Sequence, residues 1–361
     1  LLEQKGLEVK VYERDLNQNV RVQGANLDLH EDSGLEALRK ANLMEEFYDN
    51  YLPNAGVLRV LDKEGNIVID EHLQENVYDE NRPEIDRGPL RDILLNSLND
   101  DTVIWNSHFQ SMKKHGEGWL LNFKNKTSIY ADFVIGADGK NSKIRPYLSS
   151  IKPIYSGVTI VEGNIYNAKK NVPKITEILK GGKIFAFGNE QSIILSTKGD
   201  GSVAFYTGCK VDRDWVSKSE INFKNKEQVY NWFREEFKSW SLLWQDLFKS
   251  NDVSFVPRPQ YHFPLNQEWQ TVSNLTILGD AAHCMPPYAG EGVNMAMKDA
   301  YELADCLTNN KFEDAASAVS CFEIQMRERA SKIAQITLHS MEELHGKHPF
   351  KFLNSMFNEE I

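Results

Sequence analysis

The sequence predicts an α/β fold that combines a Rossmann-like cofactor domain, an inserted antiparallel sheet and a long C-terminal helix. Three observations predict it. Residues 1–6 are typical of a helix end with Gly6 as its C-cap, and the alternating strand 7–13 that follows ends in Glu13, as in the second half of a βαβ unit. Short strands with Gly-rich turns dominate residues 156–263, which indicates an antiparallel sheet. Helical periodicity resumes at residue 313 and continues to about 345.

The elements of the cofactor domain follow from local patterns. Residues 86–98 predict a helix, because Asp86 can cap it and apolar residues recur at spacings of three and four. A short apolar strand at 275–278 runs through a Gly-rich loop into a helix at about 292–307. Alternating or apolar runs predict further strands at 102–105, 119–123 and 128–135.

The inserted segment has its own pattern. We expect strands at 158–165, 183–187, 192–196 and 203–207, and an aromatic-rich helical piece at 226–248 that packs against their sheet. The interpretation divides the chain into three parts. The cofactor domain comprises 1–50, 84–150 and 272–312, the substrate domain 51–83 and 151–271, and a C-terminal bridging helix 313–361. Because the chain opens inside an element, we expect upstream residues of the cofactor domain to be missing.

The composition argues against several classes of protein. A net charge of −11 repels phosphate backbones, so nucleic acid is not an expected partner. The four cysteines lack zinc-site spacing and favour a reducing compartment, and we therefore expect a cytoplasmic protein without a metal. No apolar run approaches 18 residues and no signal peptide is evident, so no membrane association is expected.

The first candidate constellation is Glu13-Arg14, at the end of a strand. In dinucleotide-binding βαβ units, an acid at this place accepts hydrogen bonds from the adenosine ribose. The Gly-rich loop that should lie about 20 residues upstream is not in this chain. By itself the pair is more typical of a solvated strand end.

The second constellation is DFVIGADGKNSKIR, from Asp132 to Arg145. An apolar strand runs into a tight Gly-rich turn, in which Asp138 could accept hydrogen bonds from the turn or from a cofactor. Arg145 could neutralise phosphates or anchor the turn. A plain strand-turn-helix accounts for this pattern equally well.

The third constellation is ILGDAAHCMPPYAGEGVN, from Ile277 to Asn294. Asp280 is placed to bind hydroxyl groups, and the glycines before the helix leave free N–H groups at its positive end, which suits an anionic edge. We interpret His283 as structural rather than as a catalytic base, and Cys284 as inert.

Taken in order, these constellations resemble the group A flavin monooxygenases of the para-hydroxybenzoate hydroxylase type. That family has a GxGxxG loop, then DGxxSxxR, here Asp138-Gly139…Ser142…Arg145, then GD-x6-P, here Gly279-Asp280…Pro287. The resemblance implies an FAD-binding domain and a monooxygenase that uses FAD, O2 and NADPH or NADH. Because the cofactor supplies the chemistry, no catalytic residue is expected.

Within the family, VYERD (11–15), LDLHEDSG (27–34), LRDILLNSL (90–98) and GDAAHCMPPYAGEGVN (279–294) look like the tetracycline-inactivating monooxygenases. The resemblance places Arg21 at a position linked to NADPH, and Tyr288 beside the flavin and the substrate, although a packed loop aromatic is as good an interpretation of that ring. It implies a monomer acting on a small molecule. The cofactor positions that it implies are Glu13, Arg14, Asp28, Arg91, Asp138, Asp280, Pro287, Gly290, Gly292, Val293 and Asn294.

The implied substrate pocket departs from that group. Positions that hold Gln, Arg and His in the tetracycline-inactivating enzymes hold Glu162, Lys183 and Ala204 here, and an Asn and a Met become Ser340 and Leu344. Losing a His and replacing a Gln by an acid changes the polar contacts that orient a substrate. The prediction is therefore a monooxygenase of a tetracycline-like or other aromatic compound. The alternatives are a flavin reductase or dehydrogenase of the same fold, or a non-catalytic flavin- or ligand-binding protein.

Overall fold

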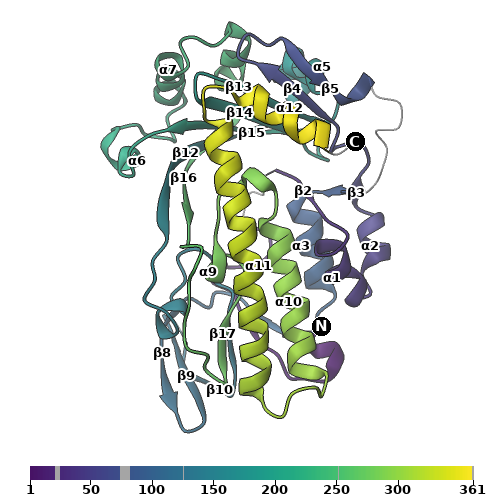
Figure 1. Ribbon diagram of the computed structural model, residues 1–361, viewed down its shortest axis with the longest axis vertical. Coiled ribbons are helices and arrows are strands. Elements are labelled where there is room, and N and C mark those ends of the chain that lie inside the picture. The colour runs from purple at the N-terminus through teal and green to yellow at the C-terminus, as the bar shows by residue number, and fades with distance from the viewer. Residues whose placement is uncertain (21–24, 74–81, 125, 251, 360–361) are drawn as a thin grey trace.

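The computed structural model of the protein describes residues 1–20, 25–73, 82–124, 126–250 and 252–359. Its lower half in Figure 1 holds two pairs of parallel strands. In one, β1 (Val11–Tyr12) pairs with β7 (Val103–Ile104), and in the other β11 (Val134–Gly136) pairs with β17 (Leu275–Ile277). Parallel strands need helical or long crossovers, and these pairs therefore mark the Rossmann-like half. A small antiparallel sheet of β8 (Phe109–His115), β9 (Gly118–Phe123) and β10 (Ile129–Ala131) lies beside them.

Helices and a second small sheet complete this half. The sheet has the order β2-β6-β3, with β2 at Leu27–Asp28, β6 at Glu84–Ile85 and β3 at Tyr51–Leu52. One of its faces packs on a core of leucines and Phe47. The helices of this half are α1 (Gly34–Lys40), α2 (Met44–Tyr48), α3 (Arg87–Asn96), α9 (Asp280–His283) and α10 (Gly292–Thr308).

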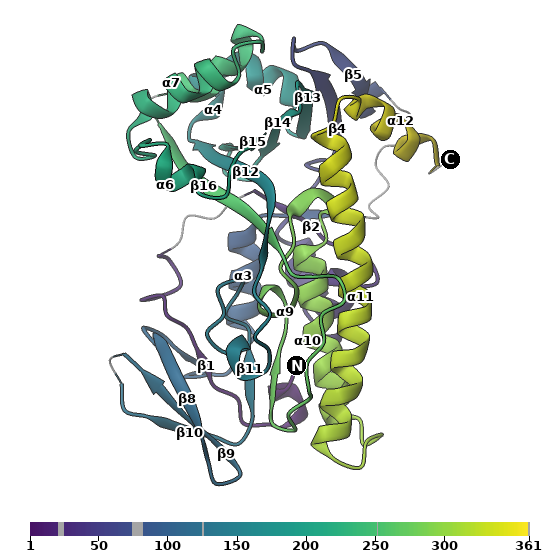
Figure 2. The same ribbon diagram turned by 60° about the vertical axis from the view of Figure 1, so that its left-hand side comes forward.

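The other half is a seven-stranded sheet in the order β16-β12-β15-β14-β13-β4-β5, all antiparallel except for β13 and β4. Its strands are β4 (Leu58–Asp62), β5 (Ile67–Asp70), β12 (Ile154–Ile165), β13 (Lys183–Gly188), β14 (Gln191–Thr197), β15 (Val203–Lys210) and β16 (Val253–His262). Figure 2 shows helices covering its upper side. These are α4 (Ala168–Asn171), α5 (Pro173–Leu179), α6 (Trp215–Lys218), α7 (Lys226–Glu236) and α8 (Asp246–Lys249).

The two faces of this sheet differ, because side chains alternate along each strand. Val161, Ile184, Leu195 and Phe205 point into the helix-covered core, where Phe233, Trp240 and Trp244 also pack. The alternate residues therefore face the Rossmann-like half. The aromatic-rich segment is thus a packing element, as the sequence predicts.

The 30-residue helix α11 (Ala315–Leu344) runs the length of the molecule beside α10 and meets α12 (Pro349–Glu359) at the sheet (Figure 1). Its cap is Asp314, whose carboxylate accepts from Ser317 N–H. Among the described residues, no helix is long and apolar enough to span a membrane.

The predicted fold class is confirmed, with corrections in detail. The expected strand 128–135 is two strands, β10 and β11, and the expected helix cap Asp86 is wrong, because its carboxylate accepts from Gly199 N–H at 2.9 Å instead. Sequence patterns missed the strands β2 to β6, and also β8, which is largely exposed, and β16, whose two prolines argue against a strand. β16 tolerates them because it lies at the edge of the sheet.

Candidate functional site

The Gly-Asp loop after β17 has a backbone that only glycine adopts without strain. Gly279 has φ 57° and ψ −143°, and an added Cβ would also lie 3.2 Å from the side chain of Ala296. The turn places Asp280 at the first position of α9, where its carboxylate is exposed. An exposed carboxylate after a strand end can accept hydrogen bonds from the hydroxyls of a ligand.

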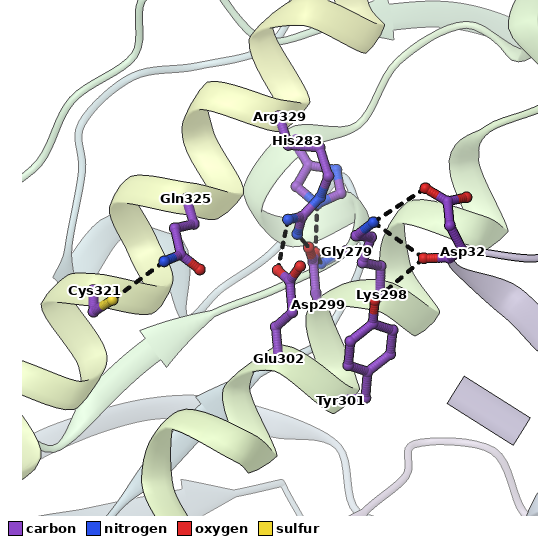
Figure 3. A network of polar contacts seen from close by, with 10 residues as sticks. All are labelled: Asp32, Gly279, His283, Lys298, Asp299, Tyr301, Glu302, Cys321, Gln325 and Arg329. Atoms are coloured by element: carbon purple, nitrogen blue, oxygen red, sulfur yellow. Dashed lines mark hydrogen bonds and ion pairs between the residues drawn. The ribbon is translucent and has the colours of Figure 1, made fainter. Parts of the chain in front are cut away.

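A buried ionic network fixes this turn from behind (Figure 3). Asp299 of α10, which is fully buried, accepts from Gly279 N–H at 2.9 Å, from His283 Nε2 at 2.5 Å and from Arg329 at 2.7 Å. Burial alone would lower the pKa of His283, but the charge and hydrogen bond of Asp299 raise it above its usual value. His283 is therefore positioned to hold the loop, as the sequence interpretation favoured.

Arg145 ties the Asp-Gly segment to the same loop. Its guanidinium is buried, donates to the carbonyl oxygens of Ala281 and Ala282 at 2.9 Å each, and lies 3.7 Å from the ring centre of Phe263. Burial lowers the pKa of Arg145 to about 10. The sequence left two roles open for Arg145, neutralising phosphates or anchoring the turn. The structure supports the second, in which Arg145 anchors the turn.

Asp138 serves its own turn. Its carboxylate accepts from Lys143 N–H at 2.7 Å and from Ile144 N–H at 3.3 Å, while the Ser142 hydroxyl accepts from Arg145 N–H. Gly139 has φ 80°, so the tight turn predicted by the sequence is present. The Asp138 side chain is nevertheless exposed, which leaves its outer lone pairs accessible.

The start of α10 is open. Gly290 has φ 71°, no side chain caps the helix, and a Cβ on Gly292 would meet no atom within 4 Å. Thr337 of α11 holds the preceding loop by accepting from Ala289 N–H and donating to Pro286 O. The exposed N-terminus of this 17-residue helix therefore offers N–H donors and a positive dipole end to a bound anion. Pro287 is exposed in this loop, and Val293 is half-buried against the core of α1.

β2 lies against this opening. The Asn294 side chain donates to Asp28 O and accepts from His30 N–H, both at 3.0 Å, so its amide is used to dock β2 on α10. Asp28 contacts His30 at 3.3 Å and Arg82 at 2.5 Å. Burial would raise the pKa of Asp28, but the His30 hydrogen bond and the charges of Lys183 and Arg82 lower it below its usual range.

Tyr288 forms a hydrogen-bonded pair with His345. The Tyr288 hydroxyl lies 2.8 Å from His345 Nε2, and His345 Nδ1 lies 2.9 Å from Glu190 O. A carbonyl oxygen only accepts, so Nδ1 carries the proton and Nε2 accepts from Tyr288. Burial raises the pKa of Tyr288 and lowers that of His345 to about 4.

This pair predicts a pH effect on stability. The pKa of His345 is about 4 in the folded chain and about 6.5 in the unfolded chain, so the unfolded chain takes up a proton first as the pH falls. The stability that neutral His345 contributes is thus present above pH 6.5 and is lost toward pH 4. Between pH 7 and pH 4.5, wild type should lose about 2 kcal/mol more free energy of unfolding than His345→Gln. Urea titrations of both proteins at the two pH values measure it, and equal losses would contradict it.

The sheet residues implied by the resemblance lie on the face toward the cofactor half. The strand register places Ala204 opposite Asn164 on one side and Ser196 on the other, with Lys183 next in the row. The Lys183 ammonium forms an ion pair with Glu84. Glu162 is buried and paired with Arg258. Ser340 and Leu344 are buried on α11, and Leu344 packs with Val60 and Phe187 of the sheet.

The remaining predicted residues lie near β1. Glu13 is half-buried, and its carboxylate accepts from Asp15 N–H at 2.9 Å; Arg14 is exposed. Arg91 of α3 donates to Gln18 O at 2.5 Å and lies 5.9 Å from the ring centre of Trp105. Arg21, the predicted NADPH contact, lies outside the described residues. Sequence reasoning missed Thr337 and His345, which hold the loop before α10 from the far end of the chain.

The fold and this arrangement define a flavoprotein class, and comparison with known proteins agrees. The family model described as "FAD binding domain" matches residues 1–333. Monooxygenase penA of Penicillium thymicola is 27% identical over 367 residues, which covers 88% of this chain and 84% of penA. The structure of HpxO from Klebsiella pneumoniae with FAD and uric acid has a TM-score of 0.75 at 17% identity, covering 99% of this chain and 87% of that one.

The chain therefore belongs to the FAD-binding family of group A monooxygenases, and it is an FAD-dependent monooxygenase. Tetracycline destructase Tet(51) is similar in structure, with a TM-score of 0.72 at 18% identity, covering 99% of this chain and 90% of that one. It is one of several structural neighbours with comparable scores, so the fold comparison does not single out the tetracycline-inactivating group, and the special closeness to that group stays a prediction.

The residues present fit the cofactor. The exposed Asp280 carboxylate suits the hydroxyls of a ribityl chain, and the uncapped start of α10, with open space at Gly292, suits the anionic edge of a reduced flavin. NADPH or NADH is the reductant typical of this class.

Proposed function

We propose that this enzyme hydroxylates a small aromatic or polyketide-like compound with NAD(P)H and O2. One observation carries the proposal: the open, uncapped start of α10 and the polar side of the seven-stranded sheet border the same region. β2 contacts both, because it is hydrogen-bonded to Asn294 of α10 and the preceding Ala25 is hydrogen-bonded to Tyr206 of the sheet. A flavin held at the helix would therefore meet a substrate held at the sheet. Bound FAD supplies the redox and oxygen-transfer chemistry.

The chain's own residues would bind FAD and orient it. Asp280 would hold the ribityl chain, Glu13 the adenosine ribose, and the N–H groups of Gly292, Val293 and Asn294 the anionic flavin edge. The buried pair of Tyr288 and His345 would close the sheet side against water, which the chemistry requires.

Tetracycline is the first substrate to test, because the sequence resembles the inactivating enzymes even though the sheet residues differ. The chain is incubated with FAD and desalted, its visible spectrum is recorded, and NADPH oxidation is followed with and without tetracycline under 18O2. Retained flavin and a product that carries one labelled oxygen atom support the proposal. Oxidation without labelled product from any aromatic substrate indicates a reductase or dehydrogenase. Absence of retained flavin in a protein with its native N-terminus contradicts the proposal altogether.

The proposed role of Asp280 has its own test. Asp280→Ala removes a charged acceptor whose hydrogen bonds are worth about 1.5–3 kcal/mol, so the Kd for FAD should rise roughly tenfold to hundredfold. Quenching of flavin fluorescence on binding measures it. Asp212→Ala, at an exposed carboxylate in the substrate half, is the control and should leave the Kd unchanged. An unchanged Kd for Asp280→Ala would remove this residue from the site.

A further inference from the structure

Two polar atoms on the site face of the sheet are buried and have no hydrogen-bond partner among the described residues. They are Asn164 Oδ1 on β12 and Ser196 Oγ on β14, and they flank Ala204 in one row of the sheet. Only 5% of Asn164 and 4% of Ser196 is exposed. The small side chain of Ala204 leaves the centre of this row without a polar group of its own.

Three more such atoms lie on or beside the paired strands β2 and β6, which cover this row. Asn26, just before β2, has both its amide oxygen and its amide nitrogen buried without a partner in the described part of the chain, and Glu84 of β6 has Oε2 in the same state. Asn26 is 7% exposed and Glu84 is 3% exposed. We call Asn26, Glu84, Asn164 and Ser196 the polar seam.

Two contacts show that the halves of the polar seam face each other. The Ala25 N–H donates to the Tyr206 hydroxyl at 2.9 Å, and Tyr206 stands on the site face of β15, two residues from Ala204. Lys183, in the row of Asn164 and Ser196, forms its ion pair with Glu84. The paired strands β2 and β6, which carry Asn26 at their edge and Glu84, are therefore docked on the row that carries Asn164 and Ser196.

Such atoms are costly when nothing binds them. A buried polar atom without a partner costs about 1–3 kcal/mol, and folded proteins keep few of them. Of the twelve such side-chain atoms in the described part of the chain, five belong to the polar seam. This concentration at one place between sheet and cofactor half points to a ligand whose polar edge would satisfy them.

Charge and hydrogen-bonding capacity narrow the ligand class. Three basic groups near the seam are paired with carboxylates: Lys183 with Glu84, Arg82 with Asp28, and Arg258 with Glu162. A fourth, Arg87, is exposed and donates to Ala25 O at 3.1 Å. Among these groups, a buried anionic ligand would thus find no unpaired positive charge that is itself buried. The unpartnered atoms are mostly acceptors, on Asn26, Asn164 and Glu84, with the Asn26 amide nitrogen as a donor and the Ser196 hydroxyl as either.

A neutral ring with an N–H next to a carbonyl matches these unpartnered atoms. Its N–H can donate a hydrogen bond to one of the acceptors, and its carbonyl oxygen can accept one from the Asn26 amide nitrogen or the Ser196 hydroxyl. Phe185 and Tyr206 in the neighbouring row can pack against a flat ring. We propose that the polar seam recognises a neutral cyclic amide as the substrate's polar edge. This inference rests on the proposed function, because it assigns the substrate class of the same site.

Calorimetric titration of the FAD-loaded chain with matched probes tests the proposal. 2-Quinolinone has the N–H beside the carbonyl, and coumarin replaces that N–H by a ring oxygen. We expect 2-quinolinone to bind at least about tenfold more tightly than coumarin, because coumarin leaves a buried acceptor unpaired. A carboxylated 2-quinolinone should bind more weakly than the parent. Equal binding of 2-quinolinone and coumarin would overturn the proposal.

Variants separate recognition from a structural role. Ser196→Ala and Asn164→Leu should each remove most of the preference for 2-quinolinone and should raise the Tm of the ligand-free chain, because an unpaired buried atom is gone. Ser217→Ala, at an exposed serine, is the control. A lower Tm with an unchanged preference in both variants would show that the seam is structural and would overturn the proposal. Labelled-oxygen transfer to an unrelated aromatic substrate, with no binding of 2-quinolinone, would reject the seam and retain the proposed function.

Discussion

Replacing Arg145 by methionine should lower the free energy of unfolding by about 4 kcal/mol. Besides Ala281 O and Ala282 O, the guanidinium donates to Ile151 O at 3.2 Å and to Gln267 Oε1 at 2.5 Å. Methionine fills the volume and keeps contact with Phe263, but it leaves Ala281 O, Ile151 O and Gln267 Oε1 without the donor that Arg145 supplies. Ala282 O keeps a hydrogen bond from Gln267 Nε2 at 2.8 Å. Each unpaired acceptor costs about 1–3 kcal/mol, and recovery of the arginine's own desolvation offsets part of the sum.

Urea denaturation followed by tryptophan fluorescence measures this loss. Arg213→Met changes an exposed arginine in the same way and should shift the free energy of unfolding by less than about 0.5 kcal/mol. Arg145→Lys separates charge from geometry: it restores the charge but not the planar fork, and should recover less than half of the loss. A loss below about 1 kcal/mol for Arg145→Met would mean that Ala281 O, Ile151 O and Gln267 Oε1 find other donors.

Arg145 also shows what sequence reasoning could reach. Its motif is visible as a spacing, DGxxSxxR, and the glycines of the turns are visible as residues that positive φ requires, as Gly139 and Gly279 confirm. The spacing could not choose between phosphate binding and anchoring, because the acceptors at Ala281 and Ala282 lie 136 and 137 residues away in sequence. Local patterns find the motif, and only tertiary structure assigns its role.

The sheet shows the same limit. Alternation of apolar and polar residues located four of the seven strands of the inserted sheet, β12 to β15, to within four residues at each end, and did not locate β4, β5 or β16. The row of Asn164, Ala204, Ser196 and Lys183 depends on the register between four strands, which side-chain periodicity within one strand does not specify. Asn26 joins them from a segment 138 residues before Asn164 in the chain. The resemblance supplied Lys183 and Ala204, while Asn26 and Ser196 could not be found without the structure.

The second large effect is expected at Asp299, which orders the Gly-Asp loop from the buried side. Asp299→Asn removes the carboxylate that joins the Gly279 N–H, His283 and Arg329 in Figure 3, and it turns one acceptor oxygen into a donor facing the Gly279 N–H or a cationic partner. Glu302 keeps its own ion pair with Arg329. Breaking a buried ion pair at one partner costs about 3–5 kcal/mol, because the other charge remains buried. The pKa of Asp299 is lowered by His283, the Gly279 N–H and Arg329 against the effect of burial, so the native structure favours the ionised acid at neutral pH.

The Asp299→Asn substitution should lower the affinity for FAD as well as the stability of the fold. Gly279 N–H loses its acceptor, the turn with φ 57° relaxes, and Asp280 moves away from its position at the start of α9. FAD affinity should then fall even under conditions where the variant is folded, with circular dichroism reporting the fold and fluorescence quenching reporting the Kd. Asp305→Asn lies on the same helix and breaks only a solvent-exposed pair with Lys40, so both readouts should remain near wild type. If Asp299→Asn loses stability but keeps the wild-type Kd for FAD, the network supports the fold without positioning Asp280, and the cofactor site is set by β17 and α10 alone.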